Sequence, residues 1–444
     1  MLHLYVIAIS GQETCLTVSS RPPQWIFNQS LRSSTSTSYR LNIFIHIVRS
    51  SKGKGLSAGI ASSIINTLNN SFTNTNIQFV LHGTDFIDSD YYYNNLTDKE
   101  NQLFTVNAHE NAIDIYVLGT STTWIGSGLA NGIPSTALII HGKHYNTSTL
   151  PHEMGHCLGL YHTHHGTIYE EGSDDTNQCA EFVDGSNSSI CGDYISDTPA
   201  DPNRWSNNSC SYIGTGVDGH GDSYTPNASN YMSYAHKPCR TLFSDLQIDR
   251  MKLFINNTPS LQQVIDYNIS GPSFVCDQAT YTIQNLLPGA IVQWSVNNNN
   301  LQLLSGQGTG MATFKKSNIG RTNITAEIYN NNILISGVNQ LVSVGVPELY
   351  TYGDYLYSGG QPKRCFVENQ ANSCYLQSDQ DENIDKWDWR VTSGEIFVSG
   401  LKNENATIYP RPSSPPSFMI EIRALNPDYA IEQKNNYNHL INKT

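Results

Sequence analysis

The residues best able to do chemistry lie in one short stretch, HEMGHCLGLYH, which fits the pattern H-E-x-x-H-x-x-G-x-x-H. On a helix, His152 and His156 are four residues apart, so both imidazoles project from one face at metal-chelating distance. Gly159 can adopt a positive φ, which ends the helix and lets His162 approach as a third ligand. Three neutral imidazoles leave the fourth position of a tetrahedral Zn²⁺ open to water. Glu153 can take a proton from that water, so the stretch predicts metal-assisted peptide hydrolysis.

Two further histidines, His164 and His165, follow the motif and compete with His162 as ligands. The spacing from Gly159 favours His162, and the other two are expected to be solvated loop residues. The alternative is that the motif histidines are ordinary helix residues, hydrogen-bonded within the protein and without a metal. This alternative applies better to a bare H-E-x-x-H than to this longer pattern.

A second element, the sequence NYMSY at residues 230–234, follows about 70 residues after the zinc motif. The pair resembles the metzincins, in which a later turn carries a methionine below the metal. The resemblance implies that Met232 forms an apolar floor under the imidazoles. It also implies that the Tyr234 phenol reaches the metal or the tetrahedral oxyanion. Taken alone, both residues would be interpreted as core packing.

Within the metzincins the chain resembles the pappalysin family, including its ulilysin-like bacterial members. The likeness covers roughly residues 40–260 and is carried by four segments: residues 152–165, residues 192–199, residues 230–234 followed by Cys239, and residues 243–251. It implies an α+β zincin catalytic domain that hydrolyses peptide bonds with Zn²⁺. Members that cleave before arginine carry acidic residues after the tyrosine, where this chain reads AHKP. An arginine preference is therefore not expected.

Oxygen-bearing side chains gather between the zinc motif and the methionine turn, and they could hold Ca²⁺. They are Asp193, Asp197, Thr198 and Asp201. The pappalysin resemblance implies a structural calcium ion in this region. The alternative is that these residues are solvated turn aspartates and a turn threonine.

Nine cysteines are present, and four of them bracket the long region between the zinc helix and the methionine turn. Disulfides there would lower the entropy of the unfolded chain. The predicted pairs are Cys179–Cys191, Cys210–Cys239 and, near the C-terminus, Cys365–Cys374. Cys157, inside the zinc motif, is expected to be a buried free thiol. A Cys₂His₂ structural zinc is the rival interpretation, but C-x-x-C spacing is absent.

The N-terminal residues 1–38 are expected to be a signal remnant or a pro-segment. Residues 2–10 are apolar but lack preceding Lys or Arg, so a signal peptide would be truncated or atypical. Residues 15–38 are rich in Ser, Thr and Pro. Some metalloprotease propeptides place a thiolate in the open zinc position, a scheme that ulilysin-like enzymes resemble. The hypothesis is that Cys15 is such an inhibitory thiol.

Composition limits the partners of this 444-residue chain, which has a net charge of −13 and only 14% charged residues. Nucleic-acid binding requires clustered Lys and Arg, and no such cluster occurs. The sequence contains no run of about 20 apolar residues, so it predicts no membrane-spanning helix. The abundance of polar uncharged residues and the cysteine pattern favour a secreted, extracellular protein.

A catalytic domain is expected over residues 39–267. The stretch 41–48 is apolar on both faces, which predicts a strand sandwiched by helices. Residues 136–140 are expected to be the edge strand that pairs with an extended substrate. Other strands are predicted at 77–81 and 112–118, and helices at 58–72, 147–160 and 244–254. His46, His141 and His144 are not at ligand spacing and are expected to be strand or loop residues.

The C-terminal part changes character to short alternating strands, which is typical of antiparallel sandwiches. Immunoglobulin-like or PKD-like modules are expected over residues 268–346 and 347–434, followed by a tail over 435–444. They are expected to bind a surface, a glycan or a protein. The chain as a whole is thus predicted to be a secreted zinc endopeptidase acting on proteins or peptides. The alternative is an adhesin or binding protein with a catalytically inactive zincin domain.

Overall fold

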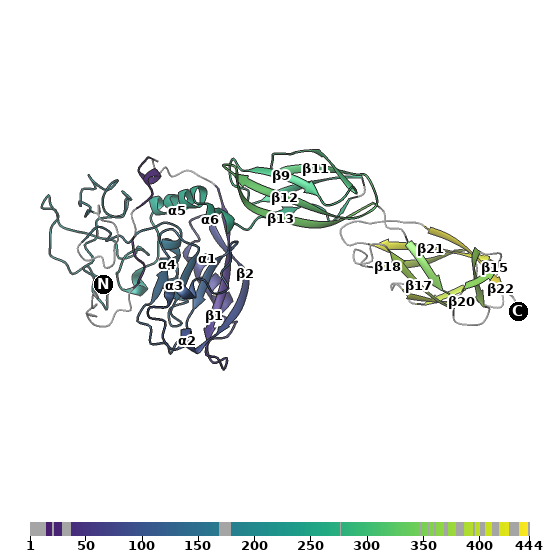
Figure 1. Cartoon of the computed structure of the whole chain (residues 1–444), viewed down its shortest axis with the longest axis horizontal. Coiled ribbons are helices and arrows are strands. Elements are labelled where there is room, and N and C mark those ends of the chain that lie inside the picture. Colours follow the sequence, from purple (N-terminus) through teal and green to yellow (C-terminus); the bar gives the residue numbers. More distant parts are fainter. Residues whose placement is uncertain are drawn as a thin grey trace. The chain divides into compact units, whose positions relative to one another are not determined.

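The computed structural model describes residues 15–19, 22–28, 37–167, 179–275 and 277–345, together with the backbone of the strands between 349 and 442. The chain separates into two compact units, Met1–Asp266 and Tyr267–Thr444 (Figure 1). No helix among the described residues is long and apolar enough to cross a membrane.

The first unit contains a five-stranded sheet with the strand order β2-β1-β3-β5-β4. Its strands are β1 (Tyr39–Arg49), β2 (Ile77–Asp88), β3 (Ile113–Val117), β4 (Gly128–Ala130) and β5 (Ala137–Ile140). The first four strands in this order run parallel, and β4 alone is antiparallel to its neighbour β5. All predicted strands of the catalytic domain are therefore present in one sheet.

The prediction that residues 136–140 form the edge strand is wrong. This strand, β5, lies between β3 and β4, and the short strand β4 occupies the edge. The reason is that β4 has only three residues and begins with a glycine, so its sequence shows no hydrophobic alternation from which a strand could be predicted. The edge available to an extended segment is consequently that of β4.

Helices cover both faces of the sheet, as the apolar β1 sequence predicted. On one face lie α1 (Ile60–Ser71), which packs against β2, and the zinc helix α4 (Thr149–Cys157), which packs against α1, β4 and β5. On the other face, Tyr93 of α2 (Asp90–Tyr93) and Leu103 of α3 (Glu100–Leu103) join one buried apolar cluster with Val48 and Tyr116 from the strands. The apolar side chains of the central strands β1, β3 and β5 are thereby buried on both sides.

The closing helix is α5 (Asp245–Asn257), and the shorter α6 (Pro259–Gln263) follows it. Helix α5 begins at a capping box, in which the Ser244 hydroxyl accepts from the Gln247 backbone N–H and the Gln247 side chain accepts from the Ser244 N–H. This reciprocal pair satisfies donors that a helix start leaves unpaired. Two 3₁₀ helices, η1 (Gln24–Asn28) and η2 (Lys237–Cys239), complete the unit.

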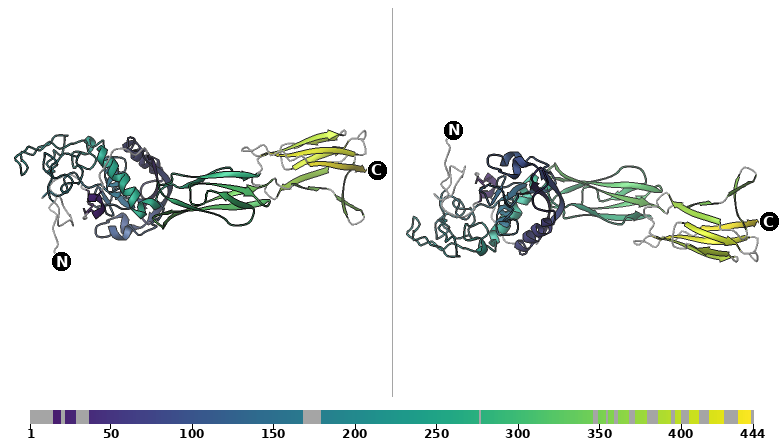
Figure 2. Two further views of the ribbon diagram at one scale, coloured as in Figure 1. Left: turned by 90° about the horizontal axis from the view of Figure 1, so that it is seen from above. Right: turned by 90° about the horizontal axis from the view of Figure 1, so that it is seen from below.

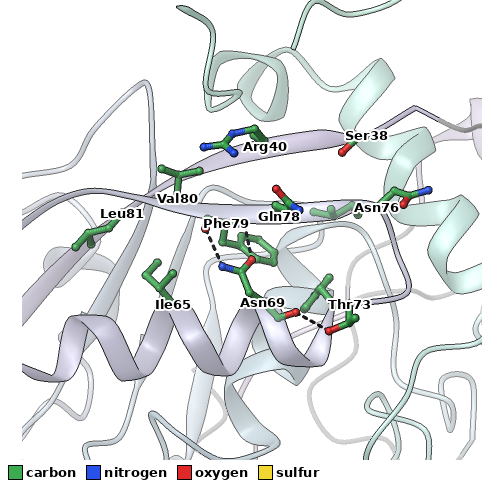
Figure 3. A pocket seen from close by; sticks show the side chains of 12 residues that line it. Ser38, Arg40, Ile65, Asn69, Thr73, Asn76, Gln78, Phe79, Val80 and Leu81 are labelled. Carbon is green, nitrogen blue, oxygen red and sulfur yellow. Dashed lines mark hydrogen bonds between the residues drawn. The ribbon is translucent and has the colours of Figure 1, made fainter. Parts of the chain in front are cut away.

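A pocket of about 580 Å³ is lined by α1, the edge strand β2 and the start of β1 (Figure 3). Asn69 of α1 lines it and pairs with the backbone of Phe79, donating at 3.0 Å and accepting at 2.8 Å. No residue of the zinc motif lines this pocket, so it is separate from the predicted catalytic residues.

The second unit is all-β. Its first part contains two four-stranded sheets, β10-β11-β8-β6 and β7-β13-β12-β9, seen in green from two further sides in Figure 2. The strands are β6 (Asn268–Ser270), β7 (Phe274–Val275), β8 (Gln278–Gln284), β9 (Ile291–Val296), β10 (Leu301–Ser305), β11 (Met311–Lys316), β12 (Gly320–Asn330) and β13 (Ile333–Val344). Along β12, Ile324, Ala326 and Ile328 are buried at alternate positions, and Trp294 is buried with its indole N–H bonded to the Thr309 carbonyl at 2.8 Å. Two facing antiparallel sheets with such alternation resemble an immunoglobulin-like sandwich.

The later strands form a four-stranded sheet, β14-β17-β20-β19, and a five-stranded sheet, β15-β16-β22-β21-β18. They are β14 (Leu349–Gly353), β15 (Tyr355–Ser358), β16 (Gln361–Val367), β17 (Asn372–Ser378), β18 (Lys386–Ser393), β19 (Ile396–Ser399), β20 (Asn405–Pro410), β21 (Ser417–Leu425) and β22 (Asn435–Asn442). The region predicted as a tail thus contains β22, which pairs with β16 and β21. The side chains of the predicted pair Cys365–Cys374 lie outside the described residues.

Candidate active site

The zinc motif lies on α4 and the turn that ends it. Helix α4 ends at Cys157, and Gly159 follows with φ +93°, a conformation that favours glycine. A Cβ at Gly159 would lie 2.1 Å from the Phe254 ring of α5, so the turn also permits close packing. The backbone N–H of Leu160 then bonds to the carbonyl of Gly155 at 2.9 Å, which directs the chain back towards the helix. This turn delivers His162 to the helix face.

The three imidazoles converge. The Nε2 atom of His156 lies 3.2 Å from Nε2 of His152 and 3.1 Å from Nε2 of His162. The Nδ1–H of His152 donates to the Tyr231 carbonyl at 2.7 Å, and that of His156 donates to the Leu160 carbonyl at 2.8 Å. In these tautomers the Nε2 lone pairs of both rings face the same point, as metal ligands require.

The electrostatics of the cluster agree with a cation site. Burial, together with the neighbouring His156 and His162, lowers the pKa of His152 well below its usual value, so the ring is held neutral. Neutral imidazoles are the form that binds Zn²⁺. The donor set, its convergence and its tautomers therefore fit zinc.

The prediction that His164 and His165 are solvated is wrong, because each is only 1% exposed. The His164 ring stacks on His162 with 4.7 Å between centroids, and His165 Nε2 lies 3.3 Å from the Tyr194 hydroxyl. His164 packs against the triad and His165 packs against Tyr161 and Tyr194. The turn after Gly159 folds inwards, which residue polarity alone does not show.

Glu153 is fully buried beside the triad. Burial raises the pKa of its carboxyl group to about 7, and hydrogen bonds from Thr17 and Cys15 lower it in part. A carboxyl group with a pKa near neutral is well matched to accepting and returning a proton. The β4 edge approaches it closely, since a Cβ at Gly128 would lie 2.4 Å from Glu153 Oε1.

The methionine turn lies beneath the helix. Met232 is fully buried, and a Cβ at Gly155 would lie 2.5 Å from its sulfur, so the glycine inside the motif makes room for the methionine. The Tyr234 ring lies 4.8 Å from the His162 ring and 6.0 Å from the His152 ring. The structure thus brings Tyr234 to the same cluster as the triad and Glu153.

Part of the N-terminal strip, residues 15–38, lies against the zinc-motif residues. Cys15 forms a parallel bridge with Gly128, and its Sγ lies 3.4 Å from Glu153 Oε2 and 3.6 Å from His156 Nε2. The Tyr234 hydroxyl donates to the Cys15 carbonyl at 3.1 Å. The Cys15 sulfur and the three imidazole nitrogens form one candidate metal-binding group, with all ligand atoms within 4.8 Å of one another.

Sequence reasoning missed two residues here. The Thr17 hydroxyl donates to Glu153 Oε2 at 2.9 Å and accepts from the Ala130 backbone N–H at 2.7 Å, which ties the strip to both β4 and the carboxylate. Arg240 is buried and donates to the Ser233 carbonyl at 3.2 Å, and burial lowers its pKa to about 10. Neither residue belongs to a recognisable motif, and only long-range packing reveals them.

The predicted calcium residues do not form one set. Both carboxylate oxygens of Asp197 accept hydrogen bonds at the start of α5, from Ser244 Oγ at 2.6 Å and from the Leu246 N–H at 2.8 Å. Asp201 accepts from Thr163 Oγ1 at 2.7 Å and from the Trp205 indole at 3.2 Å. These two aspartates therefore have structural partners of their own.

Asp193 and Thr198 do lie together, and a residue that the sequence analysis did not select joins them. Thr198 Oγ1 donates to Asp193 Oδ1 at 2.8 Å, while the buried Asp193 Oδ2 has no hydrogen-bond partner among the described residues. Glu181 lies against the same turn, because a Cβ at Gly192 would be 2.8 Å from Glu181 Oε2. Burial, followed by the charge of Asp193, raises the pKa of Glu181 to about 9.

Two of the predicted disulfides are present, Cys179–Cys191 and Cys210–Cys239. Each of these four cysteines is in a disulfide, so none of them is a ligand of the alternative Cys₂His₂ structural zinc. Cys157 is a buried free thiol, and burial raises its pKa to about 12.

Part of the chain matches a known family of metalloproteases. Residues 137–256 match the family model Peptidase_M43, described as pregnancy-associated plasma protein-A. Karilysin from Tannerella forsythia is 41% identical over 81 residues, which are 18% of this chain and 16% of karilysin. An extracellular metalloprotease of Neurospora crassa is 29% identical over 243 residues, covering 49% of this chain and 74% of the relative. Human pappalysin-1 is 32% identical over 118 residues, covering 26% of this chain and 7% of pappalysin-1.

The chain thus spans less than a fifth of the length of karilysin and of pappalysin-1. Among solved structures, metalloproteinase-II from Bacteroides fragilis matches 29% of this chain and 45% of its own, with 19% identity and a TM-score of 0.20. That score is too low to support a statement about the fold.

Proposed function

The chain contains a pappalysin-like metalloprotease domain, and on this premise we propose that it is a secreted zinc endopeptidase that cleaves internal peptide bonds of proteins. The observation that carries the proposal is the convergence of three imidazole nitrogens beside one buried carboxylate. Export is supported by the two disulfides and by a relative named as an extracellular metalloprotease.

The roles follow from position. His152, His156 and His162 would hold zinc, which when bound polarises a carbonyl and lowers the pKa of water. Glu153 takes a proton from the attacking water and returns it to the leaving amine. Tyr234 donates a hydrogen bond to the developing oxyanion. The β4 edge, which pairs with Cys15 in this structure, would pair with an extended substrate.

Replacing Tyr234 with phenylalanine should lower kcat about 10²–10³-fold, because removing one preorganised oxyanion donor typically has this effect. Zinc content should not change, since Tyr234 is not among the three imidazole ligands. The measurement is turnover of a peptide substrate, together with metal analysis, on protein from which the residues before Tyr39 have been removed. Tyr231→Phe is the matched control, because Tyr231 contacts the triad through its backbone carbonyl, which the substitution keeps. Equal turnover in both variants would remove Tyr234 from the mechanism.

We also propose a structural calcium ion at the turn formed by Asp193, Thr198 and Glu181. The buried Asp193 Oδ2 without a partner and the adjacent Glu181 carboxylate offer hard oxygen ligands, which Ca²⁺ prefers. Asp197 and Asp201 are assigned structural roles instead, because their oxygens are engaged elsewhere.

Calcium should raise Tm more at pH 8 than at pH 5. In the calcium-free protein burial raises the pKa of Asp193 to about 8 and that of Glu181 to about 9, whereas both ionise near pH 4 when unfolded. The folded state then binds more protons, so its stability falls as the pH rises from about 4 to 9. Calorimetry with a calcium-selective chelator tests this, with Glu181→Gln as the variant expected to lose the difference. A calcium effect on Tm that is the same at both pH values would contradict the site.

A digestion of casein or gelatin, with and without a zinc chelator, tests the proposed activity directly. The rival function, an adhesin with an inactive zincin domain, predicts no chelator-sensitive cleavage even after the N-terminal strip is removed. The complete set of three imidazoles, Glu153 and Tyr234 favours the enzyme. For the C-terminal strands we propose two immunoglobulin-like modules that bind a surface, a glycan or a protein.

A further inference from the structure

A second group of metal-ligating side chains lies within the five-stranded sheet and shares no residue with the zinc motif. It consists of His46 on β1, Asp114 on β3 and His109 in the loop before β3, with ligand atoms all within 4.8 Å of one another. The same limit encloses the zinc-motif group, and these two are the groups found among the described residues. We propose that His46, His109 and Asp114 bind a second Zn²⁺ ion.

The contacts converge on one carboxylate oxygen. Asp114 Oδ1 lies 3.1 Å from His46 Nε2 and 2.9 Å from His109 Nδ1. The other oxygen of Asp114 accepts the backbone N–H of His109 at 2.8 Å, which fixes the orientation of the carboxylate. The separations match those within the zinc triad, where Nε2 atoms are 3.1–3.2 Å apart. A small outward shift of the three ligands would admit an ion.

The second ring nitrogen of His46, Nδ1, contacts a carboxylate, which is a common partner of zinc-binding histidines. Asp85 Oδ1 on β2 lies 2.7 Å from His46 Nδ1, and Asn107 Nδ2 donates to Asp85 Oδ2 at 2.7 Å. A carboxylate that accepts from one ring nitrogen orients the other nitrogen towards the metal. The sheet register explains the arrangement, since His46 pairs with Asp85 on one side and Tyr116 on the other.

Charge balance also favours a divalent cation. His46 is fully buried, and its two ring nitrogens lie 2.7 Å from Asp85 Oδ1 and 3.1 Å from Asp114 Oδ1. With Zn²⁺ and neutral imidazoles, the two positive charges of the ion offset the charges of Asp85 and Asp114. Two imidazoles and one carboxylate are a zinc-like donor set, whereas Ca²⁺ and Mg²⁺ prefer oxygen ligands alone.

The ligands are rigid yet reachable. The Phe44 ring stacks on His109 with 3.8 Å between centroids, and Tyr116 stacks on His46 at 4.5 Å. Gly83 permits this, because a Cβ there would lie 2.4 Å from the Phe44 ring. The His109 and Asp85 side chains are 27% and 30% exposed, which leaves an entry path and a position for water. The ion would join β1, β3 and the loop between Asn107 and Ala112.

Zinc stoichiometry tests the site in the full chain. Metal-free protein, titrated with Zn²⁺ in calcium-containing buffer, should bind two ions, and His109→Ala and His156→Ala should each bind one. His82→Ala is the control: His82 is an exposed histidine on neighbouring β2, and this variant should still bind two. If His109→Ala binds as many ions as the parent, the second site is overturned. If His156→Ala binds as many as the parent, the proposed catalytic site fails instead.

A second measurement leaves all three ligands of the proposed second site in place. In the His156→Ala background, Asp85→Asn should weaken the remaining zinc affinity about 10–100-fold, the usual effect of removing a partner that orients a ligand. Competition with a chromophoric chelator measures this affinity, and circular dichroism checks that the variant is folded. Unchanged affinity in a folded Asp85→Asn protein would overturn the proposed geometry.

Discussion

Replacing Glu153 with alanine should abolish peptide hydrolysis while leaving zinc bound. General acid–base groups contribute about 10²–10⁴-fold, and the upper end is expected because Glu153 serves both proton transfers. Its carboxyl group is fully buried beside the imidazoles, with its pKa raised by burial to about 7. Glu153 is not one of the ligands in the candidate metal-binding group of Cys15 and the three imidazoles, so its replacement leaves every ligand in place. The measurement is single-turnover cleavage of a peptide, with zinc analysis and Tm on the same protein.

Glu153→Gln is the matched variant, since it keeps the side-chain volume and removes only the capacity to accept a proton. Both variants should be made together with Cys15→Ala, so that occupation of the cleft does not mask the comparison. An active Glu153→Gln protein that retains zinc would end the general-base assignment. Loss of zinc from both variants would instead assign Glu153 a structural role.

The zinc motif could be predicted from sequence because its information is local. Three histidines and a glycine within eleven residues define a helix face and the turn that ends it. The strands and helices with strong apolar periodicity were also predictable, as β1 and α1 show. Two disulfides followed from four cysteines that bracket one long connection.

The features that were missed depend on contacts between distant parts of the chain. β4 is too short to carry a pattern, so the edge strand was assigned to β5. Asp197 accepts two hydrogen bonds at the start of α5, about fifty residues later, a contact that the sequence does not reveal. His46 meets its partners only through the register of three parallel strands. Residue type alone cannot distinguish such a partner from solvent.

The sequence indicates that Cys15 is a candidate inhibitory thiol, but it does not indicate where Cys15 lies in the folded protein. In the structure, Cys15 Sγ lies 3.6 Å from His156 Nε2, and burial together with the charge of Glu153 raises the pKa of the thiol. Bound zinc would reverse this preference, since a coordinated thiol is deprotonated. The strip is held further by Thr17, which bonds both Glu153 and β4. We therefore propose that the chain is latent while residues 1–38 remain attached.

Cys15→Ala should raise the peptidase activity of the full-length protein at least about tenfold, which corresponds to about 1.4 kcal/mol of lost blocking interaction. The increase should appear in kcat/KM for a short peptide, because an open cleft admits substrate that the tethered thiol would otherwise exclude. Val18→Ala is the control: Val18 lies in the same strip but is exposed, so its variant should remain latent. Proteolytic removal of residues before Tyr39 should give the same activity in the parent and in Cys15→Ala. If the full-length Cys15→Ala protein is as inactive as the parent while both are activated equally by that removal, the strip blocks the cleft without help from its thiol.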